Sequence, residues 1–421
     1  MANALLVLGA GTDQLYMIKT AKKMGLKVVA VDGNPEAPGL FIADYAQAID
    51  FVKIDQVIRY CEKLISQGVK LKGVSTMGSD IPHLVSKVSS YFDWTGPSLE
   101  TGILASHKYK MKVRFKEMGV AVPKFSIVKN SKKILACWDE WKVKRVIIKP
   151  TDRAGSRGIR VISSRDEVDS AFKYASSHSI NGEILLEEYI EGLQISTETI
   201  VVDGHFKTPG FADRVYEEMQ CFWPNIMENG GWLPSLIDKK LYLKVISLVE
   251  NSAKALGIKN GVAKGDVVIC PKKGPMMIEM AARLSGGDFS ESLVPLSTGV
   301  NYVRTVIEIA MGVIPDMNEL KPKKNKVVAN RYFFPPKGIL NDIRGVEKAR
   351  KTLQLNKLDL YVKSGDTLPE IDSHGKRAGV FVVFGDDRES VQNIINNIYN
   401  TIEFQVDGVW VTGDPKKYTH D

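Results

Sequence analysis

The chain has 421 residues, of which 44% are hydrophobic and 25% charged, with a formal net charge of +8. This composition is that of a globular protein long enough for two or three domains. Basic residues are dispersed, and no apolar run approaches ~18 residues, which argues against nucleic-acid and membrane partners. No signal peptide is visible, and the four cysteines form no CxxC pair. We therefore expect a cytoplasmic protein.

The first hundred residues alternate buried strands with amphipathic helices. Strands are predicted at 4–8, 28–31 and 73–76, and helices around 15–24, 57–65 and 81–88. This order predicts a doubly wound parallel α/β sheet. Gly9-Ala-Gly11 at the first strand–helix turn, with Asp32 after the second strand, is a weak dinucleotide signal, because Gln14 stands in place of a third glycine. A tight packing turn is the alternative.

A second, α+β region begins with a helix that starts near Lys108. A buried strand at 146–150 carries Lys149 at its end, directly before the small-residue segment Arg153–Gly158. Small residues let backbone N–H groups approach phosphate oxygens, and a buried lysine needs an anion or an opening to water. The segment is therefore a candidate phosphate site. A generic glycine hairpin with a lysine that reaches the surface is the alternative.

Leu185–Ile190 is a second candidate for nucleotide binding. An extended segment offers alternating N–H and C=O groups to a purine edge, and Glu187 or Glu188 could accept its exocyclic amine. The alternative is an amphipathic strand with two exposed acids.

An irregular segment, Thr208–Pro234, is rich in aromatic residues, glycine and proline. Long irregular segments inside compact domains are often functional, so we expect it to shape an acceptor pocket. Arg214 could hold a substrate carboxylate there. The alternative for Arg214 is a surface ion pair with Glu217 or Glu218.

Two apolar strands, at 261–270 and 276–281, flank a tight turn. Asp266 and Glu279 fall near each other across this hairpin and could project to one side. Two acids in apolar surroundings need a positive partner, and Mg²⁺ takes one or two carboxylates together with substrate phosphates. Alternatively, one acid is exposed or pairs with Lys264 or Arg283. Beyond residue 312, we expect strands at 326–334 and 379–384, a helix over 391–402 and a final hairpin.

These elements, in this order, resemble the ATP-grasp superfamily. The similarity is to the branch with biotin carboxylase, phosphoribosylglycinamide synthetase, the carbamoyl-phosphate synthase large subunit and the L-amino acid ligases. It implies a preATP-grasp α/β domain over 1–105 and a two-lobed ATP-grasp domain over 106–312, with a lid at about 122–190. A C-terminal mixed-sheet module over 313–421 would complete the ATP-grasp core.

The resemblance also implies roles for single residues, with ATP and Mg²⁺, or Mn²⁺ in its place, as cofactors. The residues implied for ATP are Lys108 and Lys149 at the phosphates, Gly155, Ser156 and Gly158 in the covering loop, Glu187 at the adenine amine, the backbone of Glu188 and Ile190 at the purine edge, and Glu198 in a Ser-x-Glu pattern. Asp266 and Glu279 would hold the metal. Lys149 and Arg283 would be catalytic, with Arg283 meeting the substrate carboxylate or an acyl phosphate.

The chain departs from the family pattern at three positions, two at the expected metal site and one on the strand after the lid. Asp266 replaces a usual Glu, Gln194 replaces a common Glu, and Ala281 replaces a usual Asn. Alanine cannot coordinate a metal, so a second Mg²⁺ would lack one protein ligand.

The resemblance implies an ADP-forming carboxylate–amine ligase that acts through an acyl phosphate on a small carboxylate, for example an amino acid. Two alternatives are a biotin- or bicarbonate-dependent carboxylase of the same fold and a nucleotide-binding regulator without turnover. A homodimer is the assembly that such families suggest.

Overall fold

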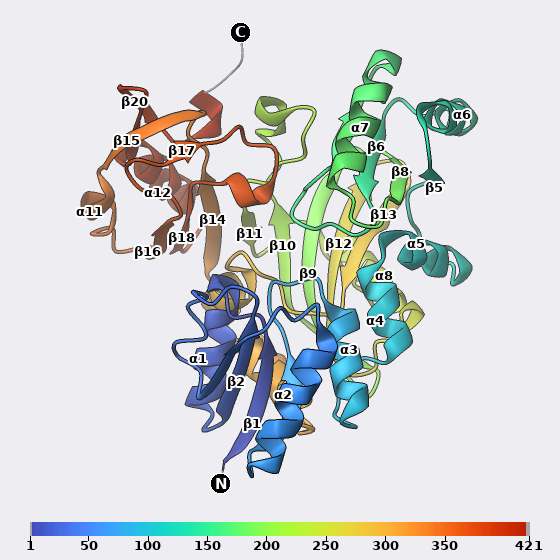
Figure 1. Cartoon of the computed structure of the whole chain (residues 1–421). Coiled ribbons are helices and arrows are strands. Elements are labelled where there is room, and N and C mark those ends of the chain that lie inside the picture. Colours follow the sequence, from blue (N-terminus) through green and yellow to red (C-terminus); the bar gives the residue numbers. More distant parts are fainter. Residues whose placement is uncertain (1, 418–421) are drawn as a thin grey trace.

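The structure is a computed structural model that describes residues 2–417. Its N-terminal unit is a parallel sheet of order β3-β2-β1-β4 with helices on both faces (Figure 1, blue). Its elements are β1 (Asn3–Leu8), α1 (Leu15–Lys23), β2 (Lys27–Asp32), β3 (Tyr45–Ala48), α2 (Ile54–Ser66), β4 (Lys70–Ser75) and α3 (Pro82–Tyr91). The predicted doubly wound sheet is confirmed. The prediction lacks β3, whose side chains are mostly exposed and give no apolar pattern.

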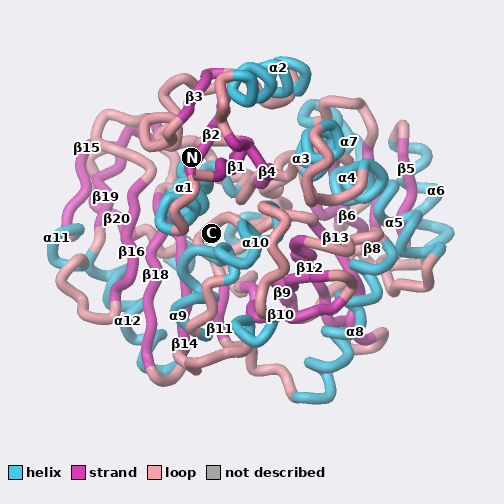
Figure 2. Tube along the Cα trace, turned by 90° about the horizontal axis from the view of Figure 1, so that it is seen from below, coloured by secondary structure: helices cyan, strands magenta, loops and turns pink. Residues whose placement is uncertain are grey.

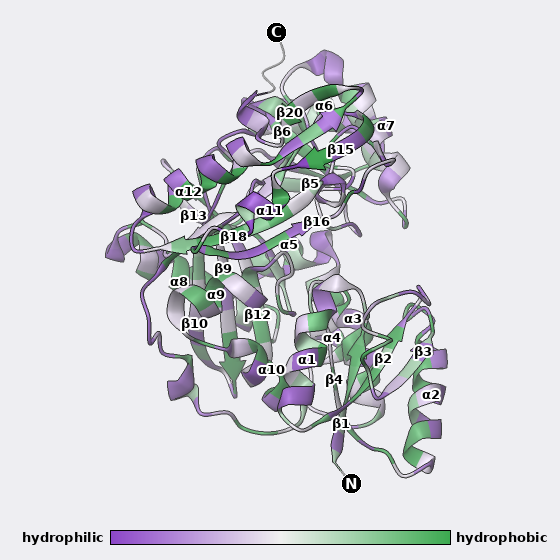
Figure 3. Ribbon diagram, turned by 90° about the vertical axis from the view of Figure 1, so that its left-hand side faces the viewer, coloured by the Kyte–Doolittle hydropathy of each residue, from purple (hydrophilic) through white to green (hydrophobic). Residues whose placement is uncertain are grey.

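Strand β1 contributes to two separate cores. Leu5 and Val7 pack with α1 and α10 (Tyr302–Ala310), whereas Leu6 and Leu8 pack with α2 and α3. Successive strand side chains point to opposite faces, so a strand covered on both sides is apolar throughout. The hydrophobic strands and half-hydrophilic helices of this unit are visible in Figure 3. The N-terminal sheet thus packs against α10, a helix about 300 residues further along the chain.

The first strand–helix turn is closed by the chain's own groups. Asp32 accepts a hydrogen bond from the Ala10 backbone N at 2.7 Å, and the Gln14 side-chain amide donates to the Met77 backbone oxygen. Gly9 has a φ of +91°, a conformation that favours glycine. These contacts support the packing turn over the dinucleotide interpretation.

The predicted lid folds as a separate antiparallel sheet of order β5-β8-β6-β7, covered by two helices. Two helices, α4 (Leu99–Ser106) and α5 (Lys108–Glu117), lead into it. Its elements are β5 (Phe125–Val128), α6 (Ser131–Trp141), β6 (Val146–Pro150), β7 (Arg160–Ile162), α7 (Val168–His178) and β8 (Ile184–Glu188). All of them lie inside the predicted lid limits of 122 and 190.

An eight-stranded antiparallel sheet of order β13-β12-β9-β10-β11-β14-β18-β16 forms the centre of the molecule. Its strands are β9 (Leu193–Val202), β10 (His205–Arg214), β11 (Gly231–Leu233), β12 (Gly261–Cys270), β13 (Gly274–Ala281), β14 (Val327–Phe333), β16 (Leu355–Leu360) and β18 (Gly379–Gly385). Helices α8 (Lys239–Ala255) and α9 (Val294–Thr298) lie between its strands in the chain. Part of the segment predicted as irregular is therefore strand, because β10 continues to Arg214. The sheet also crosses the proposed domain limit at residue 312.

The C-terminal region adds a second antiparallel sheet of order β17-β15-β19-β20. Its elements are β15 (Gly338–Arg344), α11 (Val346–Ala349), β17 (Thr367–Leu368), α12 (Arg388–Thr401), β19 (Glu403–Val406) and β20 (Val409–Thr412). This sheet and the lid lie at opposite ends of the central sheet (Figures 1 and 2). Within residues 2–417, every helix is too short or too polar to cross a bilayer.

Candidate active site

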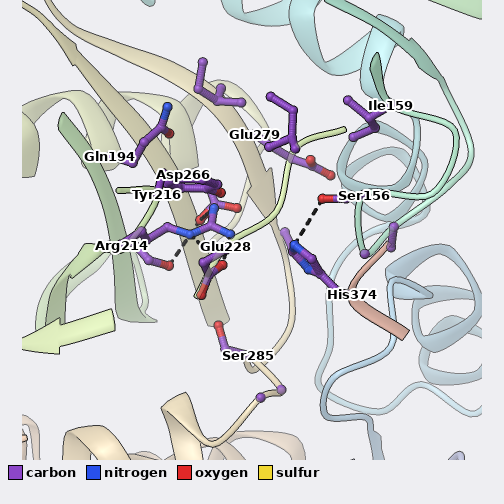
Figure 4. A pocket seen from close by; sticks show the side chains of 18 of the residues that line it. Ser156, Ile159, Gln194, Arg214, Tyr216, Glu228, Asp266, Glu279, Ser285 and His374 are labelled. Carbon is purple, nitrogen blue, oxygen red and sulfur yellow. Dashed lines mark hydrogen bonds and ion pairs between the residues drawn. The ribbon is translucent and has the colours of Figure 1, made fainter. Parts of the chain in front are cut away.

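A cavity of about 840 Å³ lies where the N-terminal unit, the lid, the central sheet and a C-terminal loop meet. Of the residues predicted for the site, all but Gly158 and Glu198 line this cavity. Figure 4 shows Asp266, Arg214 and Glu228 grouped on one side, with Ser156 and His374 facing each other on the other. The lining side chains come from segments far apart in sequence, so folding assembles the site.

The two predicted phosphate lysines are both buried beside carboxylates. Lys149, at the end of β6, places its Nζ 2.9 Å from Glu187 Oε2, and only 4% of Lys149 is exposed. Lys108, the first residue of α5, places its Nζ 2.8 Å from Glu279 Oε1. Buried lysines are kept charged by such partners. Both lysines therefore lie at the cavity wall, each beside a carboxylate.

Lys112 is a buried lysine that sequence reasoning missed. It lies one turn after Lys108 on α5, with its Nζ 3.4 Å from Glu187 Oε1 and 3.3 Å from the Met277 backbone oxygen. Burial lowers the pKa of Lys112 to about 8, although Glu187 opposes the shift. Its spacing of four residues from Lys108 puts both on one helix face, a signal that could have identified it.

Glu187 lies between two lysines and is only 1% exposed. Burial opposes its ionisation, but Lys112 and Lys149 hold its pKa below the usual value. The structure therefore shows its carboxylate in an ion network, and its predicted contact to an adenine amine stays a prediction. The neighbouring Glu188 pairs with Lys273, and its backbone N donates to the Lys124 oxygen at 2.8 Å.

The segment predicted to cover the phosphates contains three residues in the left-handed region of backbone conformation. Gly155, Ser156 and Gly158 have φ values of +64°, +61° and +75°. The loop is held by a C-terminal residue that the sequence did not indicate: the His374 backbone N donates to the Gly155 oxygen at 3.0 Å. The His374 ring Nε2 also lies 3.1 Å from Ser156 Oγ (Figure 4). Burial, together with the charge of Arg377, holds the pKa of His374 well below its usual value, so the ring is neutral.

Asp266 and Glu279 are direct cross-strand partners in the β12–β13 hairpin. Directly opposed residues point to the same face, so the predicted proximity of the two carboxylates is confirmed. Asp266 accepts from Ser196 Oγ at 3.1 Å, and it pairs with Lys264 and with Arg214. Burial opposes its charge, but Lys264 and Arg214 outweigh burial and lower the pKa of Asp266 to about 2.

Arg214 forms ion pairs inside the cavity. Its Nε donates to Glu228 Oε2 at 3.0 Å, and its NH1 lies 3.3 Å from Asp266 Oδ1. The alternative interpretation, a surface ion pair of Arg214 with Glu217 or Glu218, is wrong. Arg214 ends β10 and faces the cavity, where it pairs with Glu228 and Asp266. Glu228, in the loop before β11, was missed because its pairing depends on that loop's path.

Arg283 is fixed to the N-terminal unit. Its Nε donates to Asp80 Oδ1 at 2.7 Å, and its NH1 donates to the Leu284 oxygen at 3.1 Å. Burial opposes the charge of Asp80, but Arg283 and Lys108 hold the pKa of Asp80 below its usual value. Asp80, which sequence reasoning did not identify, therefore positions the predicted catalytic arginine.

Glu198 lies beneath the cavity, fully buried on β9. Its Oε1 accepts a hydrogen bond from the Ser285 backbone N at 3.2 Å, so it supports the loop that follows β13. Burial raises the pKa of Glu198 to about 7, although Ser285 and Lys264 oppose the shift. This carboxyl group therefore titrates near neutral pH.

Replacing Glu198 by Gln should make stability less dependent on pH. Between about pH 4.5 and 7 the folded parent retains a proton that the unfolded chain has lost, so its stability falls as pH rises. Glu198→Gln cannot titrate, and its advantage should grow from near zero below about pH 4.5 to roughly 3 kcal/mol at pH 8. Urea unfolding of both proteins from pH 5 to 8 measures this. A pH-independent difference would contradict the assignment.

Two family models match the chain. Residues 105–287 match the ATP-grasp domain, and residues 331–407 match the L-amino acid ligase C-terminal domain 2. The chain therefore contains an ATP-grasp domain and the second C-terminal domain of L-amino acid ligases. Relatives that cover two thirds or more of the chain are named as ligases.

The relatives are distant but cover most of the chain. The 3-methyl-D-ornithine–L-lysine ligase of Methanosarcina barkeri is 27% identical over 337 residues, which is 78% of each chain. The L-arginine-specific L-amino acid ligase of Bacillus subtilis is 22% identical over 294 residues, 68% of each chain. The crystal structure of an L-amino acid ligase from Bacillus licheniformis has a TM-score of 0.81 at 17% identity, covering 96% of this chain and 98% of that one. This last likeness confirms the fold.

Proposed function

We propose that the protein joins a small carboxylate, with amino acids as the leading class, to an amine through an acyl phosphate formed from ATP. The observation that supports this most is the convergence of Lys149, Glu279 and Arg283 in one cavity. These residues come from the lid, the hairpin and the loop after β13. A site built for phosphoryl transfer needs positioned charge from several directions, which this convergence provides.

The chemistry has two steps. A substrate carboxylate oxygen attacks the γ-phosphorus of ATP, and ADP leaves, which converts a poor electrophile into an acyl phosphate. An amine nitrogen then attacks the acyl carbon, phosphate leaves, and the nitrogen loses a proton. Lys108 and Lys149 would neutralise phosphate charge, and Arg283, held by Asp80, would orient the carboxylate or its phosphate.

The hairpin carboxylates differ in how well they fit a divalent cation. Glu279 has one lysine contact, at Oε1, and its side chain is 28% exposed, so it fits a hard cation that also binds phosphate. Asp266 already pairs with two cations and a hydroxyl group. Mg²⁺ bound here would neutralise charge on the ATP phosphates. Glu279 is the residue that would hold it.

The lid would keep water from the acyl phosphate. Its loop at Gly155 and Ser156 lies against His374, which comes from the C-terminal region. Water would hydrolyse an activated acyl group, so a site of this kind benefits from closure. The contact to His374 supports a closed position of this loop over the phosphates.

The two alternative functions are a bicarbonate-dependent carboxylase and a nucleotide-binding regulator, and each predicts a different result in an assay of ADP release. A bicarbonate-dependent carboxylase shares the fold, but the match at residues 331–407 to the ligase C-terminal domain favours the ligase. A regulator without turnover would bind ATP and release no ADP. The cytoplasmic location and small-molecule partners belong to this same proposal.

A coupled assay of ADP release over a panel of amino acids, singly and in pairs, tests the proposal. We expect ADP release only when a carboxylate and an amine are both present, with a matching condensed product by mass spectrometry. Release that depends on bicarbonate would support the carboxylase. ATP binding without release under every condition would exclude both enzymes.

A further inference from the structure

Asp266 is surrounded by positive side chains of its own chain. Its Oδ1 lies 3.3 Å from Arg214 NH1, and its Oδ2 is bound by Lys264 Nζ. Lys264 precedes Asp266 by two residues on β12, so both side chains leave the strand on the same face. The side chains of Lys264 and Arg214 are only 13% and 17% exposed. Strand geometry thus keeps the Lys264 ammonium within reach of this carboxylate.

Lys264 also lies directly opposite Ala281 in the hairpin register. Opposed residues of an antiparallel pair have Cβ atoms about 4.5–5.5 Å apart, so a small Ala281 leaves room for the lysine. A methyl group offers no ligand to a metal. Within residues 2–417, no group of three or more His, Cys, Asp or Glu side chains is arranged to hold a metal ion.

A divalent cation at Asp266 would have to compete with these charges. Mg²⁺ binds carboxylate oxygens at about 2.0–2.1 Å and favours near-octahedral geometry. At that distance from Asp266 it would be repelled by both Lys264 and Arg214, which already satisfy the carboxylate. Among residues 2–417, Glu279 has one ion-pair partner within 4 Å, Lys108, and its second carboxylate oxygen has none, so a cation there would meet one bound ammonium group where Asp266 has two positive partners. The two acids of the hairpin therefore have different environments.

We propose that Lys264, positioned by Asp266, supplies to the bound phosphates the positive charge that a second divalent cation would otherwise supply. Glu279 is then the one hairpin carboxylate that holds a metal ion. Asp266 acts as a positioning residue for the lysine. This inference rests on the proposed ATP-dependent function, and it predicts one metal ion for each bound nucleotide.

The first test counts metal ions without catalysis. Mn²⁺ is titrated into the full chain with the β,γ-imido analogue of ATP, and bound Mn²⁺ is measured by electron paramagnetic resonance. We expect one Mn²⁺ per protein, a loss of about tenfold or more in Mn²⁺ affinity for Glu279→Gln, and a change within about threefold for Asp266→Asn. Two bound Mn²⁺ ions, or equal losses in the two variants, would overturn the inference.

The second test asks what Lys264 contacts. Lys264→Met should weaken binding of the imido analogue about tenfold more than binding of ADP, and Lys264→Arg should restore most of the difference. Lys207→Met, an exposed lysine on β10, is the matched control and should change neither affinity. If Lys264→Met weakened binding of both nucleotides equally, Lys264 would have only a structural role. If the parent protein binds neither nucleotide, the proposed function itself fails, which is a distinct result.

Discussion

Replacing Glu279 by Ala is expected to lower turnover by about 10³-fold or more. Glu279 accepts from Lys108 at 2.8 Å and is the carboxylate that we propose for the metal ion, so its loss removes two contributions to phosphate binding. Initial rates of ADP release at saturating Mg²⁺ and ATP measure the effect. Retained turnover in Glu279→Ala would show that the metal assignment is wrong.

Two variants control this experiment. Glu389→Ala removes an exposed carboxylate on α12 that does not line the cavity, and it should leave the rate unchanged. Glu279→Gln keeps the shape and removes the charge, and it should lose nearly as much activity as Glu279→Ala. A fully active Gln variant would show that hydrogen bonding, and no metal, explains the residue.

Replacing Lys149 by Met should reduce both activity and stability. We expect turnover to fall by about 10²–10³-fold, because Lys149 is a fixed cation at the proposed phosphate site. The folded state should lose about 3 kcal/mol, the lower end for a broken buried ion pair, because Lys112 still faces Glu187. Urea unfolding and the affinity for ATP are the two measurements.

A double variant separates these two effects. Lys149→Met combined with Glu187→Gln removes both charges of this pair and leaves an amide oxygen that can accept from the buried Lys112, so stability should return part of the way to that of the parent. Activity should stay low, since the phosphate cation is still missing. Recovery of both properties would show that Lys149 serves only to neutralise Glu187.

Local periodicity explains which features could be predicted from the sequence. Alternation along two short strands predicted that Asp266 and Glu279 share a face, and the hairpin register confirms it. The parallel sheet was predictable because strands buried on both faces are continuously apolar. Strand β3 lacks this pattern and could not be identified.

Contacts between segments far apart in the chain could not be predicted from the sequence. Arg283 meets Asp80 across 203 residues, and Ser156 meets His374 across 218 residues. No local spacing links such pairs, because the path of the whole chain decides them. Arg214 shows the same limit at short range: nearby acids were expected, yet the turn before β11 brings Glu228 to it instead.

The continuous central sheet has a consequence for recombination between related ligases. Strand β14 hydrogen-bonds to β11 on one side and to β18 on the other. Exchanging residues 313–421 would therefore replace β14 while its hydrogen-bonding neighbour β11 remained. A donor strand that paired poorly with β11 would leave strand edges exposed and invite aggregation. The lid, with a sheet and core of its own, is the segment that could be grafted intact, through crossover points near residues 121 and 190.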